Sequence, residues 1–173
     1  LLYLGRTTQI PLTRLDYVRI ATLELLATEI TEKNVDGAVA ELGVYKGGFA
    51  KYLNQVFPDK KLYLFDTFEG FVPSDMDREK KMRPDAGFQD FSDTSVKSVL
   101  DKMTRPDQCI IKKGVFPESF SGLETEKFCL VSIDADLYEP VLSGLNLFYE
   151  QLSPGGSTMV HDYNNTFYPG CKT

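Results

Sequence analysis

Two aspartates, Asp134 and Asp136, follow the apolar run 128–133 in the stretch SIDADLYEP. A carboxylate at the end of a buried strand is costly unless it is paired with an opposite charge or bound to a metal ion. Because side chains alternate along an extended segment, both carboxylates would point to the same side. This spacing therefore indicates a site in which carboxylates hold a ligand or move a proton.

Comparable residues stand at the ends of other strand-like runs, which alternate with stretches of helical spacing. The strand-like runs are 37–44, 61–68, 108–116, 127–136 and 157–163, and the helical stretches are 11–30, 47–57, 93–103 and 139–156. Such alternation predicts an α/β fold with a mostly parallel sheet and helices on both faces. Ligands bind beyond the carboxyl ends of strands in these sheets. The residues expected there are Glu41, Gly43, Asp66, Gly114, Asp134, Asp136 and Asp162.

Local patterns predict where the helices begin and end. Thr13 with Asp16 forms a capping box for the first helix, and Asp93 is the expected N-cap of the third. The sequence Pro-Gly-Gly at 154–156 is expected to end the last helix before its strand begins. The charged run 75–81 is interpreted as a solvated helix face, or as part of a lid over a substrate.

The turn ELGVYKGGFA joins the first strand to its helix. In a G-x-G-x-x-G dinucleotide turn, Gly43 and Gly48 would take the first and third positions, but Tyr45 occupies the second. A pyrophosphate would meet the phenol ring, so the turn suits a nucleoside without phosphates. Asp66 is placed to accept hydrogen bonds from both ribose hydroxyls. A nucleoside bound in this way without phosphates points to S-adenosylmethionine. The alternative is that Gly47 and Gly48 only allow close packing of helix and strand.

The blocks ELGVYKGG, LFDTFEGF, SIDADLYEP, LSPGG and HDYN followed by PGCK resemble the macrocin O-methyltransferase family, from about residue 36 to the end. The resemblance implies a Rossmann-like class I methyltransferase fold. It also implies an S-adenosylmethionine-dependent, metal-requiring enzyme of natural product biosynthesis that methylates hydroxyls of sugars or phenolic metabolites. The expected partner is a small-molecule hydroxyl acceptor.

The same resemblance implies roles for individual residues. Glu41, Gly43 and Gly47 would form the cofactor loop, and Asp66 would hold the ribose. Asp134 and Asp162 would bind a divalent cation, usually Mg²⁺. Members of the family often carry two adjacent acids at the end of the fifth strand, and here the first of them is His161. The candidates for the third metal ligand are then His161, Tyr163 and Asn164. We predict Asn164 as this ligand.

The chemistry of methyl transfer adds two catalytic candidates. A hard cation can ligate the acceptor hydroxyl and lower its pKa, and a carboxylate or a histidine can take the proton. We therefore predict catalytic roles for Asp136 and His161. The alternative for Asp136 is an N-cap of the following helix, and the alternative for His161 is a packed structural residue.

Further contacts with the cofactor are expected from residues at the strand ends. Tyr45, Thr67 and Asp134 complete the predicted set of cofactor-binding residues. Gly114 and Phe116 are expected to line the adenine pocket, and the alternative for them is an ordinary turn closed by Pro117.

Composition sets the remaining limits. The chain has 173 residues and a net charge of -6. It lacks a cluster of Lys and Arg interleaved with aromatics, so a nucleic-acid-binding groove is not expected. The apolar runs are too short to span a membrane. The three scattered cysteines show no metal-ligand spacing, so reduced thiols and a cytoplasmic location are expected. A homo-oligomer is compatible with all of this.

We expect residues 1–173 to form a single S-adenosylmethionine-binding domain taken from a longer protein. The pair of antiparallel strands that normally closes this fold has no counterpart in the chain, so the domain is expected to be incomplete at its C-terminal end. Two other functions remain open. A non-catalytic S-adenosylmethionine-binding domain is kept open by His161, and an NAD-linked oxidoreductase is disfavoured by Tyr45.

Overall fold

A parallel sheet of five strands forms the centre of the computed structural model, which describes residues 17–82, 89–163 and 171. Its strands are β1 (Ala38–Leu42), β2 (Leu62–Asp66), β3 (Cys109–Lys113), β4 (Phe128–Ile133) and β5 (Leu152–Val160). Their order across the sheet is β3-β2-β1-β4-β5, and every neighbouring pair is parallel. The predicted Rossmann-like α/β architecture is confirmed.

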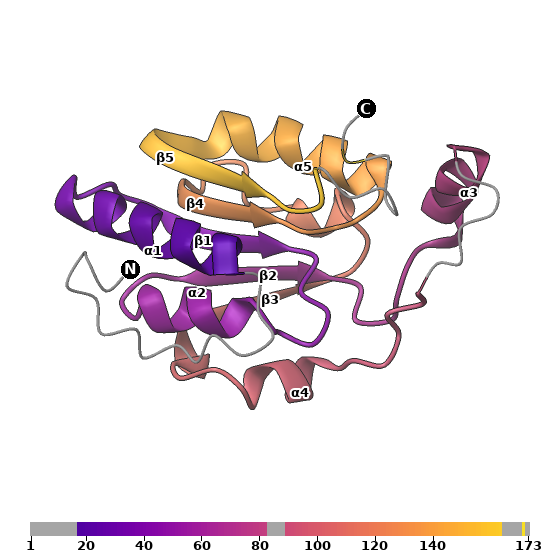
Figure 1. The fold of residues 1–173 in the computed structure, drawn as a ribbon, viewed down its shortest axis with the longest axis horizontal. Coiled ribbons are helices and arrows are strands. Elements are labelled where there is room, and N and C mark those ends of the chain that lie inside the picture. The colour runs from indigo at the N-terminus through magenta and orange to yellow at the C-terminus, as the bar shows by residue number, and fades with distance from the viewer. Residues whose placement is uncertain (1–16, 83–88, 164–170, 172–173) are drawn as a thin grey trace.

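Helices cover both faces of this sheet (Figure 1). One face packs against α1 (Tyr17–Glu32), α2 (Ala50–Val56) and α4 (Val96–Leu100). The other face packs against α5 (Tyr138–Gln151) and the short 3-10 turn η3 (Glu118–Phe120). A second 3-10 turn, η2 (Pro106–Gln108), leads into β3.

Burial across the sheet follows the strand order. Every residue of the central strands β1 and β4 is buried, as expected for strands covered on both faces. On the α5 side the core is aromatic, and the ring of Phe148 lies 5.2–5.8 Å from four other phenylalanine rings, measured between centroids. These rings belong to Phe65, Phe116, Phe120 and Phe128.

The boundary between α5 and β5 differs from the prediction. The helix ends at Gln151 and the strand begins at Leu152, so the Pro-Gly-Gly sequence lies within β5 and does not end the helix. Pairing with β4 explains this, because Leu152 is opposite Phe128 and Ser157 is opposite Leu130. The extra residues bulge out of this outer strand, where proline and glycine are tolerated.

Two predicted caps have different outcomes. The N-cap of α4 is Ser95, which forms a capping box with Ser98, so the assignment of Asp93 was wrong. The carboxylate of Asp93 instead pairs with Lys46. The capping box predicted at Thr13 and Asp16 lies outside the described residues.

The helix α3 (Pro73–Met82) lies beyond the carboxyl ends of the strands (Figure 1). It contains the charged run predicted as a solvated face. Glu79 departs from that prediction because it is fully buried, and the main-chain N–H of Tyr138 in α5 donates to its Oε2 over 3.4 Å. The helix is therefore tied to the start of α5. None of the helices among the described residues combines the length and apolar character that a membrane span requires.

Candidate functional site

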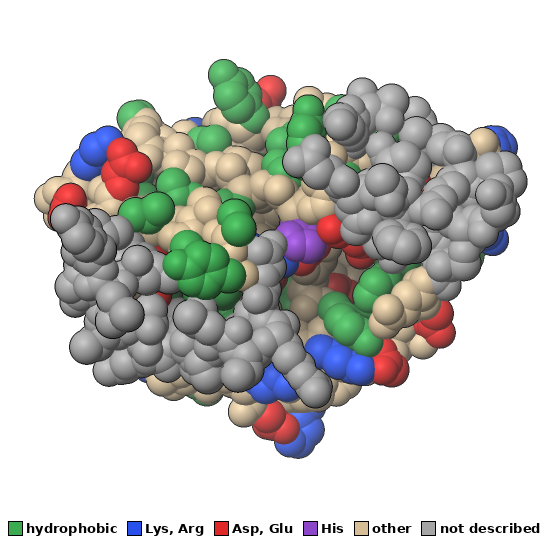
Figure 2. Space-filling view, viewed as in Figure 1, with side chains coloured by type: hydrophobic (Ala, Val, Ile, Leu, Met, Phe, Trp, Pro, Cys, Tyr) green, Lys and Arg blue, Asp and Glu red, His purple; other side chains and the backbone are tan. Residues whose placement is uncertain are grey.

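A cavity of about 570 Å³ opens beyond the carboxyl ends of the strands. It lies where the chain order reverses, since β1 is flanked by β2 on one side and by β4 on the other. This is the expected ligand position in an open α/β sheet, and the volume suits a small-molecule ligand. Figure 2 shows the single histidine beside a hollow, with acidic side chains next to it.

The glycine turn after β1 is held in place from two sides. Gly43 has a φ of +85°, and a Cβ at this position would lie 2.1 Å from the carbonyl oxygen of Asp134, so only glycine fits. On the other side, Oδ2 of Asp66 accepts hydrogen bonds from the main-chain N–H groups of Val44 (2.7 Å) and Tyr45 (2.8 Å). The turn thus brings the ends of β1, β2 and β4 together.

Asp66 therefore has a structural task in addition to the predicted one. Its Oδ1 accepts from the N–H of Phe68 at 2.6 Å. A carboxylate has about four acceptor positions, and these main-chain groups occupy three of them. Asp66 and Thr67 both line the cavity. The contact between Asp66 and a ribose stays a prediction.

The two adjacent glycines of the turn face different surroundings. A Cβ on Gly47 would lie 3.0 Å from Val99 and 3.2 Å from Met103, so this residue faces the region around α4. Gly48 lines the cavity and Gly47 does not. The predicted cofactor contact at Gly47 stays a prediction.

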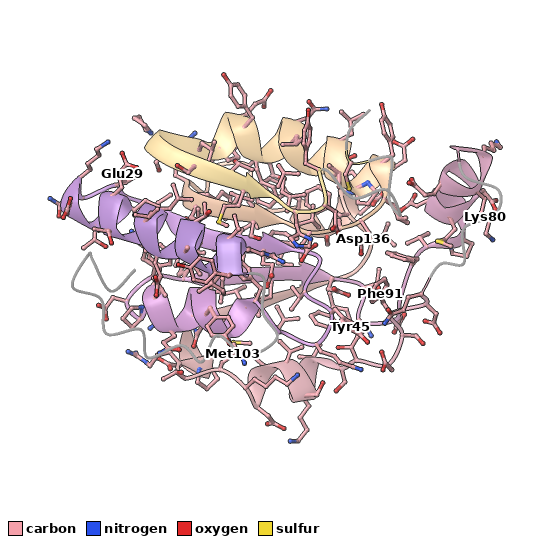
Figure 3. All side chains as sticks on the ribbon, in the orientation of Figure 1. Glu29, Tyr45, Lys80, Phe91, Met103 and Asp136 are labelled. Atoms are coloured by element: carbon pink, nitrogen blue, oxygen red, sulfur yellow. The ribbon has the colours of Figure 1, made fainter. Side chains whose placement is uncertain are left out.

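The side chain of Tyr45 forms part of an aromatic wall, defined as Tyr45, Phe71 and Phe91. Its ring packs edge-on against Phe91 with centroids 4.9 Å apart, and Phe91 packs in the same way on Phe71 at 5.1 Å. The hydroxyl of Tyr45 donates to Oδ1 of Asp93 over 2.5 Å. Figure 3 shows Tyr45 and Phe91 together, with Asp136 on the other side of the cavity.

Glu41 is buried at the end of β1 with a side chain that is 1% exposed. Burial raises the pKa of its carboxyl well above the ordinary value, while Arg19 acts in the opposite direction. Its Oε2 has no hydrogen-bond partner within the described part of the chain. A buried oxygen of this kind is costly, so Glu41 is suited to receive a donor group from a ligand in the cavity.

Arg19 of α1 lines the same cavity and was missed in the sequence. Its guanidinium donates to Oδ2 of Asp134 over 2.5 Å and to Oγ of Ser132 over 3.0 Å, and it lies 3.6 Å from Glu41. It also stacks on the ring of Phe49, 3.7 Å from the centroid. Arg19 thus holds the two acids at the ends of β1 and β4.

Beside Arg19, a cluster that we call the carboxylate–imidazole cluster consists of Asp134, His161 and Asp162. Nδ1 of His161 lies 2.9 Å from Oδ1 of Asp134 and 3.0 Å from Oδ2 of Asp162. One potential ligand atom from each residue lies within 4.8 Å of the others, so the cluster could hold a metal ion. The structure therefore gives His161, predicted as a catalytic residue, a position suited to a metal ligand.

The charges in the cluster are strongly coupled. The carboxylates of Asp134 and Asp162 raise the pKa of His161 to about 10. Burial acts to raise the pKa of Asp134, but His161 and Arg19 together hold it below its ordinary value. These shifts favour a protonated imidazole beside an ionised Asp134.

Asp136 lies next to this cluster, with a φ of +60°. Burial raises the pKa of its carboxyl to about 9, and a hydrogen bond with Asp162 adds to the effect. The N-cap of α5 is Leu137, and no side chain caps this helix. The alternative interpretation of Asp136 as a helix cap was therefore wrong.

The remaining predicted residues are the other candidates for the third metal ligand and the cofactor-binding residues. Asn164, the predicted third metal ligand, lies outside the described residues. Tyr163, the other substitute considered, is 54% exposed. The predicted cofactor residues that line the cavity are Glu41, Gly43, Tyr45, Asp66, Thr67, Gly114, Phe116 and Asp134.

Comparison with known proteins decides the family. The sequence profile described as Macrocin-O-methyltransferase (TylF) matches residues 7–173. The chain belongs to the macrocin O-methyltransferase family. This confirms the resemblance seen in the sequence.

Curated relatives and solved structures agree with this assignment. The chain is 27% identical over 167 residues to the 8-demethyl-8-(2,3-dimethoxy-alpha-L-rhamnosyl)-tetracenomycin-C 4'-O-methyltransferase of Streptomyces olivaceus, covering 90% of this chain and 62% of that one. It is 26% identical over 168 residues to the mycinamicin III 3''-O-methyltransferase of Micromonospora griseorubida, covering 89% of this chain and 65% of that one. This member of the macrocin O-methyltransferase family thus spans less than two thirds of either relative.

Two solved structures share the fold. The O-methyltransferase NovP matches with a TM-score of 0.72 at 22% identity, covering 89% of this chain and 67% of that one. The calicheamicin methyltransferase CalS11 matches with a TM-score of 0.68 at 21% identity, covering 93% and 70%. These similarities support the class I methyltransferase fold.

The pKa shifts predict how the cation-free protein responds to pH. Asp136 has a raised pKa, so its contribution to stability is lost as pH rises from about 3.9 towards about 9. The contribution of His161 is lost between about 6.5 and about 10. Both act in the same direction, so the melting temperature in chelator should fall between pH 7 and pH 10. Thermal unfolding at several pH values tests this prediction. A melting temperature that rises between pH 7 and pH 10 would contradict the raised pKa values of Asp136 and His161.

Proposed function

We propose that the protein is an S-adenosylmethionine-dependent, divalent-cation-assisted O-methyltransferase. Its acceptor would be a hydroxyl of a sugar or phenolic secondary metabolite. The observation that carries this proposal is the meeting of two parts in one cavity: the glycine turn with Glu41 and Asp66, and the carboxylate–imidazole cluster. The names of the relatives agree with it, since both are O-methyltransferases and one name includes a rhamnosyl group.

The residues present fit both groups. Glu41 offers a buried acceptor oxygen without a partner among the described residues, which suits the ammonium of a methionine moiety. Asp134, His161 and Asp162 offer three potential ligand atoms to one cation. The cofactor supplies an electrophilic methyl group, and a bound cation lowers the pKa of a hydroxyl that it ligates.

The side chains of the cavity supply positioning and proton transfer. The turn fixed by Asp66 and Gly43 would hold the cofactor next to Asp134. The aromatic wall gives that side of the cavity an apolar lining. Asp136 lies near enough to Asp162 to share a hydrogen bond with it, so in its ionised form it could take a proton from a hydroxyl held at the cluster.

Calorimetric titration distinguishes this proposal from its rivals. The protein should bind S-adenosylhomocysteine and should not bind NAD at comparable concentrations. Methyl transfer to a panel of sugar and phenolic acceptors should require a divalent cation. Binding of NAD alone would support an oxidoreductase, whereas cofactor binding with no transfer to any acceptor would support a non-catalytic domain.

Replacing Asp66 with Asn tests the cofactor half of the cavity. The amide nitrogen of Asn would face at least one main-chain N–H group that now donates a hydrogen bond to Asp66. Hydrogen bonds to a charged group contribute about 1.5–3 kcal/mol each. We expect affinity for S-adenosylhomocysteine to fall by about tenfold or more. Asp107→Asn is a matched control, because Asp107 is an exposed acid paired with Arg105 away from the cavity. Unchanged affinity in Asp66→Asn would contradict both the ribose contact and the role in the turn.

A cytoplasmic location and a homo-oligomeric state remain predictions. Gel filtration of the purified chain tests the second of them.

A further inference from the structure

The donor set of the carboxylate–imidazole cluster includes a nitrogen. Two of its potential ligands are carboxylate oxygens, from Asp134 and Asp162, and the third is an imidazole nitrogen of His161. Mg²⁺ prefers oxygen ligands and keeps several waters. Imidazole is a better ligand for Zn²⁺, Fe²⁺ and Ni²⁺, while carboxylates are compatible with either class. The nitrogen therefore bears on which cation the cluster prefers.

The separations between these atoms suit coordination to one ion. Nδ1 of His161 lies 2.9 Å from Oδ1 of Asp134 and 3.0 Å from Oδ2 of Asp162. Two adjacent ligands of an octahedral ion, each about 2.1 Å from the metal, lie about 3.0 Å apart. The imidazole nitrogen thus already stands at the distance that coordination beside each carboxylate requires.

Hydrogen bonds of the main chain fix the backbone of His161 and Asp134. The N–H of His161 donates to the carbonyl of Ile133 over 2.8 Å, and the N–H of Asp134 donates to the carbonyl of Leu42 over 2.8 Å. Arg19 binds the oxygen of Asp134 that faces away from the imidazole. Support of this kind orients ligands and is a regular feature of metal sites. These contacts fix the backbone of both residues and the carboxylate of Asp134.

We propose that His161 is a metal ligand and that it gives the cluster a preference for a divalent first-row transition metal over Mg²⁺. The inference rests on the proposed cation-assisted function and adds the class of cation to it. It concerns binding, so it is testable without knowing the methyl acceptor.

Titration calorimetry on the full chain, freed of any histidine tag, compares Mn²⁺, Co²⁺, Zn²⁺ and Mg²⁺. We expect Co²⁺ and Zn²⁺ to bind at least tenfold more tightly than Mg²⁺, and Mn²⁺ to fall between them. The single histidine of the sequence makes the result easy to assign. In His161→Asp the donor set becomes all oxygen, so the ratio of Co²⁺ to Mg²⁺ affinity should fall at least tenfold.

A second variant separates the imidazole from a nearby thiol. Cys171 lies close to the cluster, and its Sγ contacts the carbonyl oxygen of Asp136 at 3.1 Å. Cys171→Ser should retain the preference for Co²⁺, and loss of the preference in this variant would overturn the role of His161. Should His161→Asp melt far below the parent, His161→Asn provides the same comparison.

The outcomes distinguish this inference from the proposed function. Equal affinity for Mg²⁺ and Co²⁺ in the parent, or an unchanged ratio in the folded His161→Asp variant, would overturn the metal preference alone. Absence of binding by every dication, in protein that still binds S-adenosylhomocysteine, would overturn cation assistance and the inference together.

Discussion

Asp134→Asn should reduce cation-dependent methyl transfer by at least about 10²-fold. Asp134 contacts Arg19 through one oxygen and His161 through the other, so it links the fixed charge of α1 to the predicted metal ligands. Loss of a residue that merely orients a ligand costs about 10- to 100-fold in metal affinity or activity, and loss of a ligand should cost at least as much. Initial rates at increasing cation concentration measure the effect.

Two further measurements make this result specific. Affinity for S-adenosylhomocysteine should change little, because the contact of Gly43 with Asp134 involves the main-chain carbonyl. Asp107→Asn again provides the control, with the same chemical change away from the cavity. Undiminished activity of Asp134→Asn without any metal requirement would refute a metal-assisted mechanism.

The sequence predicted the location of the site well because the topology of a parallel sheet determines it. Residues that follow strands in the chain must meet at one edge of the sheet when all the strands run in the same direction. Glu41, Asp66 and Asp134 are separated widely in sequence, yet they line the same cavity. Gly43 follows the same logic, since its close approach to Asp134 is a consequence of the pairing of β1 with β4.

Arg19 could not be placed in the same way, because its role depends on how α1 rests on the sheet. One indication was present in the sequence. The buried residues Leu23, Ala27 and Ile30 follow Arg19 at helical spacing, so the arginine lies on the side of the helix that faces the core. Its partners Glu41 and Asp134 lie on distant parts of the chain, and local patterns do not specify such pairs.

Contacts between side chains within the site could not be predicted from the sequence either. The pairing of Asp136 with Asp162 depends on the left-handed backbone that both residues adopt, with φ values of +60° and +58°. An extended backbone was assumed for Asp136, and a helix cap was the alternative. The boundary of β5 was missed for a related reason, because pairing with β4 outweighed the local preference of Pro-Gly-Gly for a turn.

Asp136→Asn should lower turnover by about 10²- to 10⁴-fold if Asp136 is the general base, with little change in cation affinity. Asn is a suitable replacement because it tolerates the left-handed backbone. Its NH₂ group can also donate to Asp162, as the protonated carboxyl of Asp136 does. The variant thus keeps the positioning role and removes only the ability to take a proton, so near-normal turnover would show that Asp136 acts solely by orienting Asp162.

The pH profile gives an independent measure of the same role. A base must be ionised to act, so the rate of the parent should rise with pH up to the pKa of Asp136. That pKa is about 9 without a cation, and a positive charge bound beside Asp162 should move the rise to lower pH. In Asp136→Asn the rising limb should disappear from the rates measured at saturating cofactor and cation. If the limb persists unchanged, the proton goes to another group, and Asp136 is excluded as the base even if turnover has fallen.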